Sequence, residues 1–189
     1  MVLMLSDEFS ESEKKDLINI ALMALKSAVL DNKSLSLSGV SSCLMLPGAC
    51  FVTLLKNNQL RGCIGTLEAF RPLAEDVARN SYNAAMCDSR FPVVEPFELS
   101  DLELSISVLT KPKEMVVDSE AQLLKIIRPG IDGVVLQDGP HKSTYLPSVW
   151  EQLPDAVDFI RELKCKAGLT QSYWSASMRC FIYQSVCIK

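Results

Sequence analysis

The stretch LRGCIGT, residues 60–66, has the composition of a β-strand but contains two glycines. Glycine weakens a strand interior because it has no side chain to pack and loses more backbone entropy on folding. Two glycines within four residues therefore indicate either a bend or the close approach of another group. In a regular strand Arg61, Cys63 and Gly65 share one face, where a thiol and a cation flank open backbone. We therefore predict a site there.

The residues around this stretch predict a β-hairpin followed by a helix. Residues 49–55 and 59–67 are the two strands, and the turn between them contains two asparagines, which tolerate left-handed backbone. Pro72 is expected as the first helical residue, where its missing N–H costs nothing. That helix is predicted to end near Asp88, so the hairpin places the glycine-containing strand against it.

The rest of the chain mixes hairpins and helices, which favours an α+β fold with mainly antiparallel sheet. The predicted elements are a helix over 11–30 behind a Ser-x-x-Glu capping box, a loop or short edge strand over 31–42, a strand over 102–108 antiparallel to the hairpin, a helix over 119–127, a hairpin over 134–146, a helix over 154–167 and one closing strand over 178–188.

We expect one domain over residues 1–189 with two lobes. Pro112 marks the clearest internal boundary. The larger lobe is predicted to contain residues 1–110 and 151–189, with helices flanking its sheet. The smaller, hairpin-containing lobe is predicted to contain residues 111–150.

Composition narrows the function classes. The chain is 48% hydrophobic and 22% charged, as in ordinary globular proteins, and its net charge of −4 argues against a broad nucleic-acid surface. Residues 17–30 are too short and too interrupted to span a bilayer, and residues 1–9 lack the features of a secretory signal. Seven cysteines without a Cys-x-x-Cys pair indicate reduced thiols in the cytoplasm. With one histidine, no metal site is expected.

The stretch LRGCIGT, followed by Asp88-x-Arg90-Phe91-Pro92, resembles the AMMECR family, protein A of the AmmeMemoRadiSam system. The resemblance continues in the blocks LELSISVL (102–109), PGxDGV (129–134), LP (146–147) and KAGL (166–169), and at Trp174. It implies a two-lobed α+β fold and an intracellular protein. It also implies a pathway shared with Memo-like proteins, which are related to dioxygenases, and with radical-SAM proteins. It implies no particular reaction, and no cofactor motif is found, so none is predicted.

Cys63 is the candidate catalytic residue. A nucleophilic thiol needs a cation, a helix N-terminus or a base to lower its pKa, and Arg61 could supply the charge. His141 lies outside every block of the resemblance, so no Cys–His pair can be carried over. The alternative is that Cys63 is a small residue packed in the interior or in a pocket wall. His141 itself is assigned no role.

The candidate ligand-binding residues are Arg61, Gly62, Gly65, Thr66, Glu68, Asp88 and Arg90. Guanidinium groups match carboxylate or phosphate oxygens, and exposed glycine backbone admits an anion. In the alternative interpretation the glycines accommodate a β-bulge beneath a crossing helix. The arginines then pair internally, Arg90 with Asp88 and Arg61 with Glu68. Glu68 and Asp88 could also act as acid and base, or lie solvated at the surface.

Three functions follow from these alternatives. The first is a small-molecule enzyme, or a component of one, with an anion-accepting cleft around residues 60–66. The second is a non-catalytic module that docks Memo-like or radical-SAM partners. The third, an RNA-associated regulator, is disfavoured by the acidic composition. Whether the protein is an enzyme stays open at this point.

Overall fold

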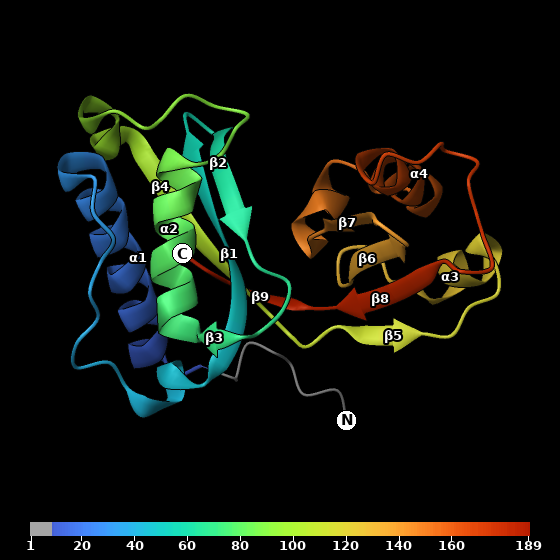
Figure 1. The fold of residues 1–189 in the computed structure, drawn as a ribbon, viewed down its shortest axis with the longest axis horizontal. Coiled ribbons are helices and arrows are strands. Elements are labelled where there is room, and N and C mark those ends of the chain that lie inside the picture. Colours follow the sequence, from blue (N-terminus) through green and yellow to red (C-terminus); the bar gives the residue numbers. More distant parts are fainter. Residues whose placement is uncertain (1–8) are drawn as a thin grey trace. The chain divides into compact units, whose positions relative to one another are not determined.

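The computed structural model describes residues 9–189, which form two compact units (Figure 1). Of the described residues, the first unit contains 9–109 together with Val186–Lys189, and the second contains Thr110–Ser185. Both combine antiparallel sheet with helices, which confirms the predicted α+β class. The prediction that residues 1–9 contain no secretory signal lies outside the described residues, apart from Phe9.

The first unit is a sheet with two helices on one face (Figure 1). Its elements are α1 (Glu11–Asp31), β1 (Pro47–Lys56), β2 (Gln59–Gly65), β3 (Arg71–Pro72), α2 (Leu73–Met86), β4 (Leu102–Leu109) and β9 (Ser185–Ile188), with 3-10 turns at Ser42–Met45 and Pro96–Asp101. The strand order is β2-β1-β4-β9, and β3 pairs with the start of β1. Strand β2 is therefore at an edge of this sheet.

The predicted limits of the two long helices are close to the observed ones. Ser10 caps α1 through the expected capping box with Glu13. Helix α2 begins one residue later than predicted because Pro72 is its N-cap rather than its first residue. It ends at Met86, so Asp88 lies just beyond it. Residues 32–41 contain neither helix nor strand, so the loop prediction for this part is confirmed and the edge strand is wrong.

The second unit has its own sheet and its own core. Its elements are β5 (Lys113–Met115), α3 (Glu120–Ile126), β6 (Gly133–Asp138), β7 (His141–Tyr145), a 3-10 turn (Pro147–Glu151), α4 (Ala156–Lys166) and β8 (Arg179–Tyr183), with strand order β5-β8-β6-β7. Ser119 caps α3, and Asp155 caps α4. The buried ring of Trp150 stacks on Phe159 with centroids 3.7 Å apart.

The second unit extends further along the chain than the predicted smaller lobe. Residues 151–185, expected in the larger lobe, belong to it because α4 contributes Phe159, Ile160 and Leu163 to its core. Hydrophobic periodicity can show that a helix buries one face, but it does not show which sheet covers that face.

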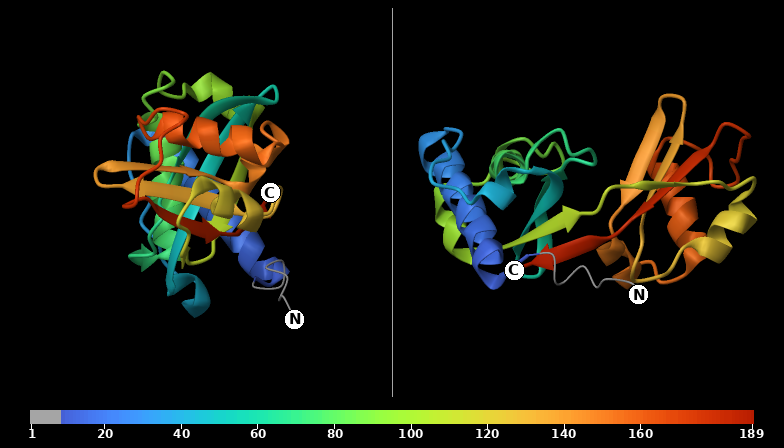
Figure 2. Two further views of the ribbon diagram at one scale, coloured as in Figure 1. Left: turned by 90° about the vertical axis from the view of Figure 1, so that its right-hand side faces the viewer. Right: turned by 90° about the horizontal axis from the view of Figure 1, so that it is seen from below.

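The prediction of one closing strand over residues 178–188 is wrong. The chain forms β8 in the second sheet and β9 in the first, visible as two consecutive red arrows in Figure 2. Gln184 separates them, and its N–H donates to Thr110 Oγ1 (2.8 Å) while Thr110 N–H donates to its carbonyl oxygen (2.9 Å). The two points at which the chain passes between the units are therefore hydrogen-bonded to each other.

Candidate functional site on strand β2

Strand β2 pairs with β1 through a β-bulge. Thr53 lies opposite Cys63 and Leu54 opposite Gly62, but Leu55 lies opposite Leu60, so Arg61 is the extra residue. Beyond the bulge the alternation is regular. Ile64 packs on the core beneath the helices, and the neighbouring Cys63 therefore faces the other side of the sheet.

The two glycines of β2 admit parts of the protein itself. A Cβ on Gly62 would lie 2.2 Å from the carbonyl oxygen of Ala84 in α2. A Cβ on Gly65 would lie 2.2 Å from the ring of Phe51 on β1. The first glycine lets the helix cross the strand, and the second makes room for an aromatic ring. The close approach predicted from sequence is thus made by a helix backbone and a phenyl ring.

The thiol of Cys63 lies on the sheet face opposite the helices. It is half-buried, and its Sγ is 3.3 Å from Thr53 Oγ1 on the adjacent strand. Ser105 on β4 lies opposite Thr53 and continues this polar row across the sheet. The other cysteine of the hairpin, Cys50, is buried among the helices instead.

Asp88 and Arg90 form an ion pair that binds the outer edge of β2 at Cys63. Asp88 Oδ2 accepts the Cys63 N–H (2.9 Å), and Arg90 Nη2 donates to the Cys63 carbonyl oxygen (3.1 Å). Arg90 also donates to both Asp88 oxygens through Nε and Nη2, at 2.9 and 2.7 Å. The pair therefore occupies backbone groups that another strand would otherwise bind, which protects the sheet edge.

The hydrogen bonds between Asp88, Arg90 and the backbone of Cys63 shift the pKa values of both side chains. The Arg90 guanidinium and then the Cys63 N–H lower the pKa of Asp88 to about 2. The pKa of Arg90 is raised, chiefly by its hydrogen bonds to Asp88 and also by Coulombic attraction to Cys63. The Arg90 side chain is 53% exposed, and within residues 9–189 its Nη1 makes no hydrogen bond. This guanidinium can still donate to a ligand.

Arg61 is fully engaged by a different segment. Its Nε and Nη2 donate to Glu98 at 3.1 and 2.8 Å, and its Nη1 and Nη2 donate to the carbonyl oxygens of Pro92 (2.9 Å) and Val93 (3.1 Å). The Arg61 hydrogen bonds, followed by a backbone N–H, lower the pKa of Glu98 to about 2. Arg61 therefore fixes the segment after α2 to the sheet instead of offering a free guanidinium.

Thr66 takes part in a buried network around Asp76. Asp76 is 1% exposed, and its Oδ2 accepts bonds from Thr66 Oγ1, from the Cys50 N–H (3.0 Å) and from Asn80 Nδ2 (3.0 Å). Its Oδ1 lies 3.6 Å from Arg71 Nε. The network joins the end of β2 to the first turns of α2.

Most of the predicted residues thus fall into three separate groups. Cys63, Asp88 and Arg90 are joined directly, Arg61 contacts the adjacent segment, and Thr66 belongs to the Asp76 network. Glu68 lies in the exposed loop between β2 and β3. His141 is in the second unit, where its Nδ1 donates to the Ala167 carbonyl oxygen (2.9 Å).

Sequence reasoning missed Glu98, Asp76 and Asn80. Glu98 is far from Arg61 in sequence, so only the fold reveals that pair. Asp76 and Asn80 gave a usable signal, because their spacing from Leu73 places them on the buried face of α2. Buried polar residues need partners, and this would have predicted a network there.

Within residues 9–189 no group of three or more histidine, cysteine or carboxylate side chains is arranged to hold a metal ion. Within the same limits, no helix combines the length and the hydropathy that a membrane span requires.

Comparison with known proteins agrees with the resemblance noted above. The family model AMMECR1 matches residues 18–188. A protein of Methanothermobacter thermautotrophicus is 34% identical over 179 residues, covering 93% of each chain. A protein of Saccharolobus islandicus is 38% identical over 165 residues, covering 84% of this chain and 72% of the relative.

A solved structure extends the comparison to the fold. The crystal structure of the uncharacterized protein PH0010 from Pyrococcus horikoshii superposes with a TM-score of 0.89 at 26% identity, covering 95% of this chain and 92% of the other. The family model, the relative from Methanothermobacter thermautotrophicus and the solved structure each match nearly the whole sequence. The chain belongs to the AMMECR1 family.

Proposed function

We propose that the protein is a component of a small-molecule enzyme system whose Cys63 face binds a small anionic metabolite. The observation that carries this proposal is the Asp88–Arg90 pair. It binds the backbone of Cys63 and leaves both the thiol and Arg90 Nη1 available. A free guanidinium N–H beside a thiol and a hydroxyl can bind carboxylate or phosphate oxygens.

The geometry supports binding better than covalent catalysis. The hydrogen-bond partner of the Cys63 thiol is the Thr53 hydroxyl, which is a poor base at neutral pH. Asp88 and Glu98 remain ionised because their arginine partners hold their pKa values near 2, so neither can donate a proton at pH 7. Cys63 is therefore proposed as part of a binding surface, and the reaction is assigned to partner proteins.

The pathway and the location follow from family membership alone and are part of the same proposal. Memo-like and radical-SAM proteins are the proposed partners, acting on the bound metabolite in the cytoplasm. No cofactor is assigned to this chain, and nucleic acid is not a proposed ligand because the net charge is −4.

Protection from alkylation tests the anion site. Iodoacetamide labelling at each cysteine can be followed by peptide mass spectrometry, with phosphate, sulfate and succinate as probes at constant ionic strength. We expect at least one anion to slow labelling of Cys63 severalfold while leaving the exposed Cys165 unchanged. The substitution Arg90→Gln should abolish this protection, and Arg90→Lys should restore part of it. Equal labelling of Cys63 with and without every anion would overturn the proposal.

A second function, partner docking, is favoured by the segment that Arg61 holds. Its hydrogen bonds to Pro92, Val93 and Glu98 fix this segment, while the side chains of Phe97 (74% exposed) and Val93 (46%) stay in solvent. Exposed apolar side chains on a fixed backbone bind partners at low entropic cost. We propose this segment as the surface for a protein partner.

Binding of purified Memo-like and radical-SAM proteins tests this second function. Phe97→Ser should weaken association at least tenfold without changing the fold, whereas Val116→Ser, at an exposed position in the second unit, should not. If Phe97→Ser binds both partners as the unchanged protein does, or if neither partner associates at micromolar concentration, this docking role is excluded.

A further inference from the structure

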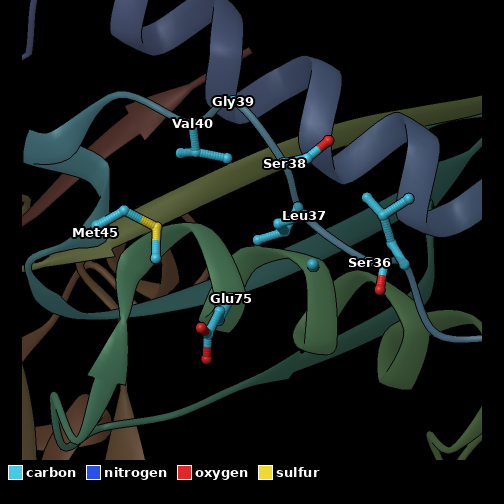
Figure 3. A pocket seen from close by; sticks show the side chains of 9 residues that line it. Ser36, Leu37, Ser38, Gly39, Val40, Met45 and Glu75 are labelled. Atoms are coloured by element: carbon cyan, nitrogen blue, oxygen red, sulfur yellow. The ribbon is translucent and has the colours of Figure 1, made fainter.

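The first unit contains a hollow that is separate from the Cys63 face. It has a volume of about 500 Å³ and lies between residues 35–40 and helix α2 (Figure 3). Volumes of this order are typical of small-molecule sites in proteins. Because α2 covers the sheet face opposite Cys63, the hollow is independent of the function proposed above.

The walls of the hollow are polar and apolar in about equal measure, with Ser36 and Ser38 among the polar residues. Leu35, Leu37, Val40, Met45 and Ala78 supply hydrocarbon and thioether surface. Leucine and valine side chains here are only partly buried against the core, so a ligand would remove further apolar area from water. Methionine adapts its shape to different ligands. The apolar half of the wall therefore suits an aliphatic or aromatic group.

One charged side chain lines the hollow. Glu75, in the first turn of α2, is exposed, and its carboxylate makes no ion pair or hydrogen bond with any residue between 9 and 189. Among the residues that the structure describes, no basic side chain lines the hollow. The positive end of α2 amounts to about half a charge, so the carboxylate dominates locally. A positively charged ligand group would therefore complement the charge of this site.

The polypeptide backbone supplies further acceptors. Residues 35–40 line the hollow and form no backbone–backbone hydrogen bonds within the described part of the chain. Their carbonyl groups are therefore open to a donor. An ammonium group has three N–H donors and can bind a carboxylate and carbonyl oxygens together.

We propose that this hollow binds a small primary amine with an apolar body. The ammonium group pairs with Glu75 and with carbonyl groups of residues 35–40. The apolar body packs on Leu37, Val40 and Met45, whose side chains are shown around the space in Figure 3.

Phenethylamine is the test ligand, with 2-phenylethanol and 3-phenylpropionate as probes of the same shape but different charge. Binding to the full chain can be measured by ligand-observed NMR and calorimetry. We expect roughly millimolar affinity for the amine, as fits a small fragment in an open site. The alcohol should bind about fivefold more weakly, and the carboxylate should not bind detectably.

Substitutions then locate the site. Glu75→Gln should weaken amine binding about threefold to fivefold and make it equal to that of the alcohol. Val40→Lys should abolish amine binding, because it introduces a cation and fills the space. Glu151→Gln, at an exposed carboxylate in the second unit, is the matched control and should leave binding unchanged. Absence of amine binding at 10 mM, equal binding of all three probes, or unchanged affinity in Glu75→Gln would each overturn the proposal.

Discussion

The two ends of helix α2 each place an aspartate on the backbone N–H of a cysteine, yet the two sites differ in character. Asp76 in the first turn accepts from Cys50 (3.0 Å), and Asp88 just after the last turn accepts from Cys63 (2.9 Å). The first site is sealed, and burial raises the pKa of the Cys50 thiol well above its usual value. The second site lies at the sheet edge with a half-buried thiol and an exposed arginine. The same type of hydrogen bond thus stabilises the fold at Cys50 and, we propose, supports a binding site at Cys63.

Removing the buried carboxylate of Asp76 should cause the largest loss in the free energy of unfolding. Asp76→Ala leaves the N–H of Cys50 and the hydroxyl of Thr66 without their acceptor, and the amide of Asn80 keeps the Cys50 carbonyl oxygen. We expect the free energy of unfolding in urea to fall by about 3–5 kcal/mol. Asp76→Asn, which keeps one acceptor oxygen, should lose less. If Asp76→Ala lost less unfolding free energy than Asp88→Asn, the buried Asp76 site would not be the more important one for stability.

Separating α2 from the strand should disturb both sites together. In Gly62→Ala the new methyl group would lie 2.2 Å from the Ala84 carbonyl oxygen, and backbone cannot move aside as a flexible side chain can. We expect a loss of roughly 2–3 kcal/mol in unfolding free energy. Amide hydrogen exchange at both Cys50 and Cys63 should accelerate. Exchange that changes at only one of them would show that the helix ends respond independently.

Asp88→Asn should affect the edge site alone and should do so in a pH-dependent way. The pKa of Asp88 is lowered from 3.8 to about 2, so its ionised form stabilises the folded state above pH 3.8, and this contribution is lost as pH falls through 2. At pH 7 the variant should be less stable by about 1–2 kcal/mol. The difference between the two proteins in urea unfolding should vanish near pH 2. A constant difference from pH 7 to pH 2 would contradict this assignment.

The smallest expected effects come from the two cysteines themselves. Cys50→Ser places a smaller, more polar atom in a sealed network and should cost about 1 kcal/mol. Cys63→Ser changes a half-buried group beside a hydroxyl and should cost less than about 0.5 kcal/mol. Thermal unfolding of the two variants measures both values. The reverse order would mean that Cys63, not Cys50, is the structural thiol.

Local sequence signals predicted the elements well because each signal acts within a few residues. The Ser10–Glu13 capping box and the asparagine turn both lie where their patterns indicated. The internal pair of Asp88 and Arg90 was foreseen as one of two alternatives because the residues are two positions apart.

What sequence could not supply is the set of contacts between distant segments. Arg61 has several acidic candidates in the sequence, and only the path of the chain after α2 brings Glu98 to it. The glycines correctly signalled a close approach, but a strand pattern does not say whether a helix, a ring or a ligand comes near. The division of residues 178–188 between two sheets likewise depends on which core each apolar side chain joins.

The return of the chain to the first sheet at β9 has a consequence for synthesis on the ribosome. Val186 and Ile188 are buried in the first core, yet they are translated after the whole of the second unit. While the ribosome makes the second unit, β4 lacks its neighbour β9 in the first sheet. The first unit must therefore wait with an open sheet edge, a period in which nascent chains are vulnerable to aggregation.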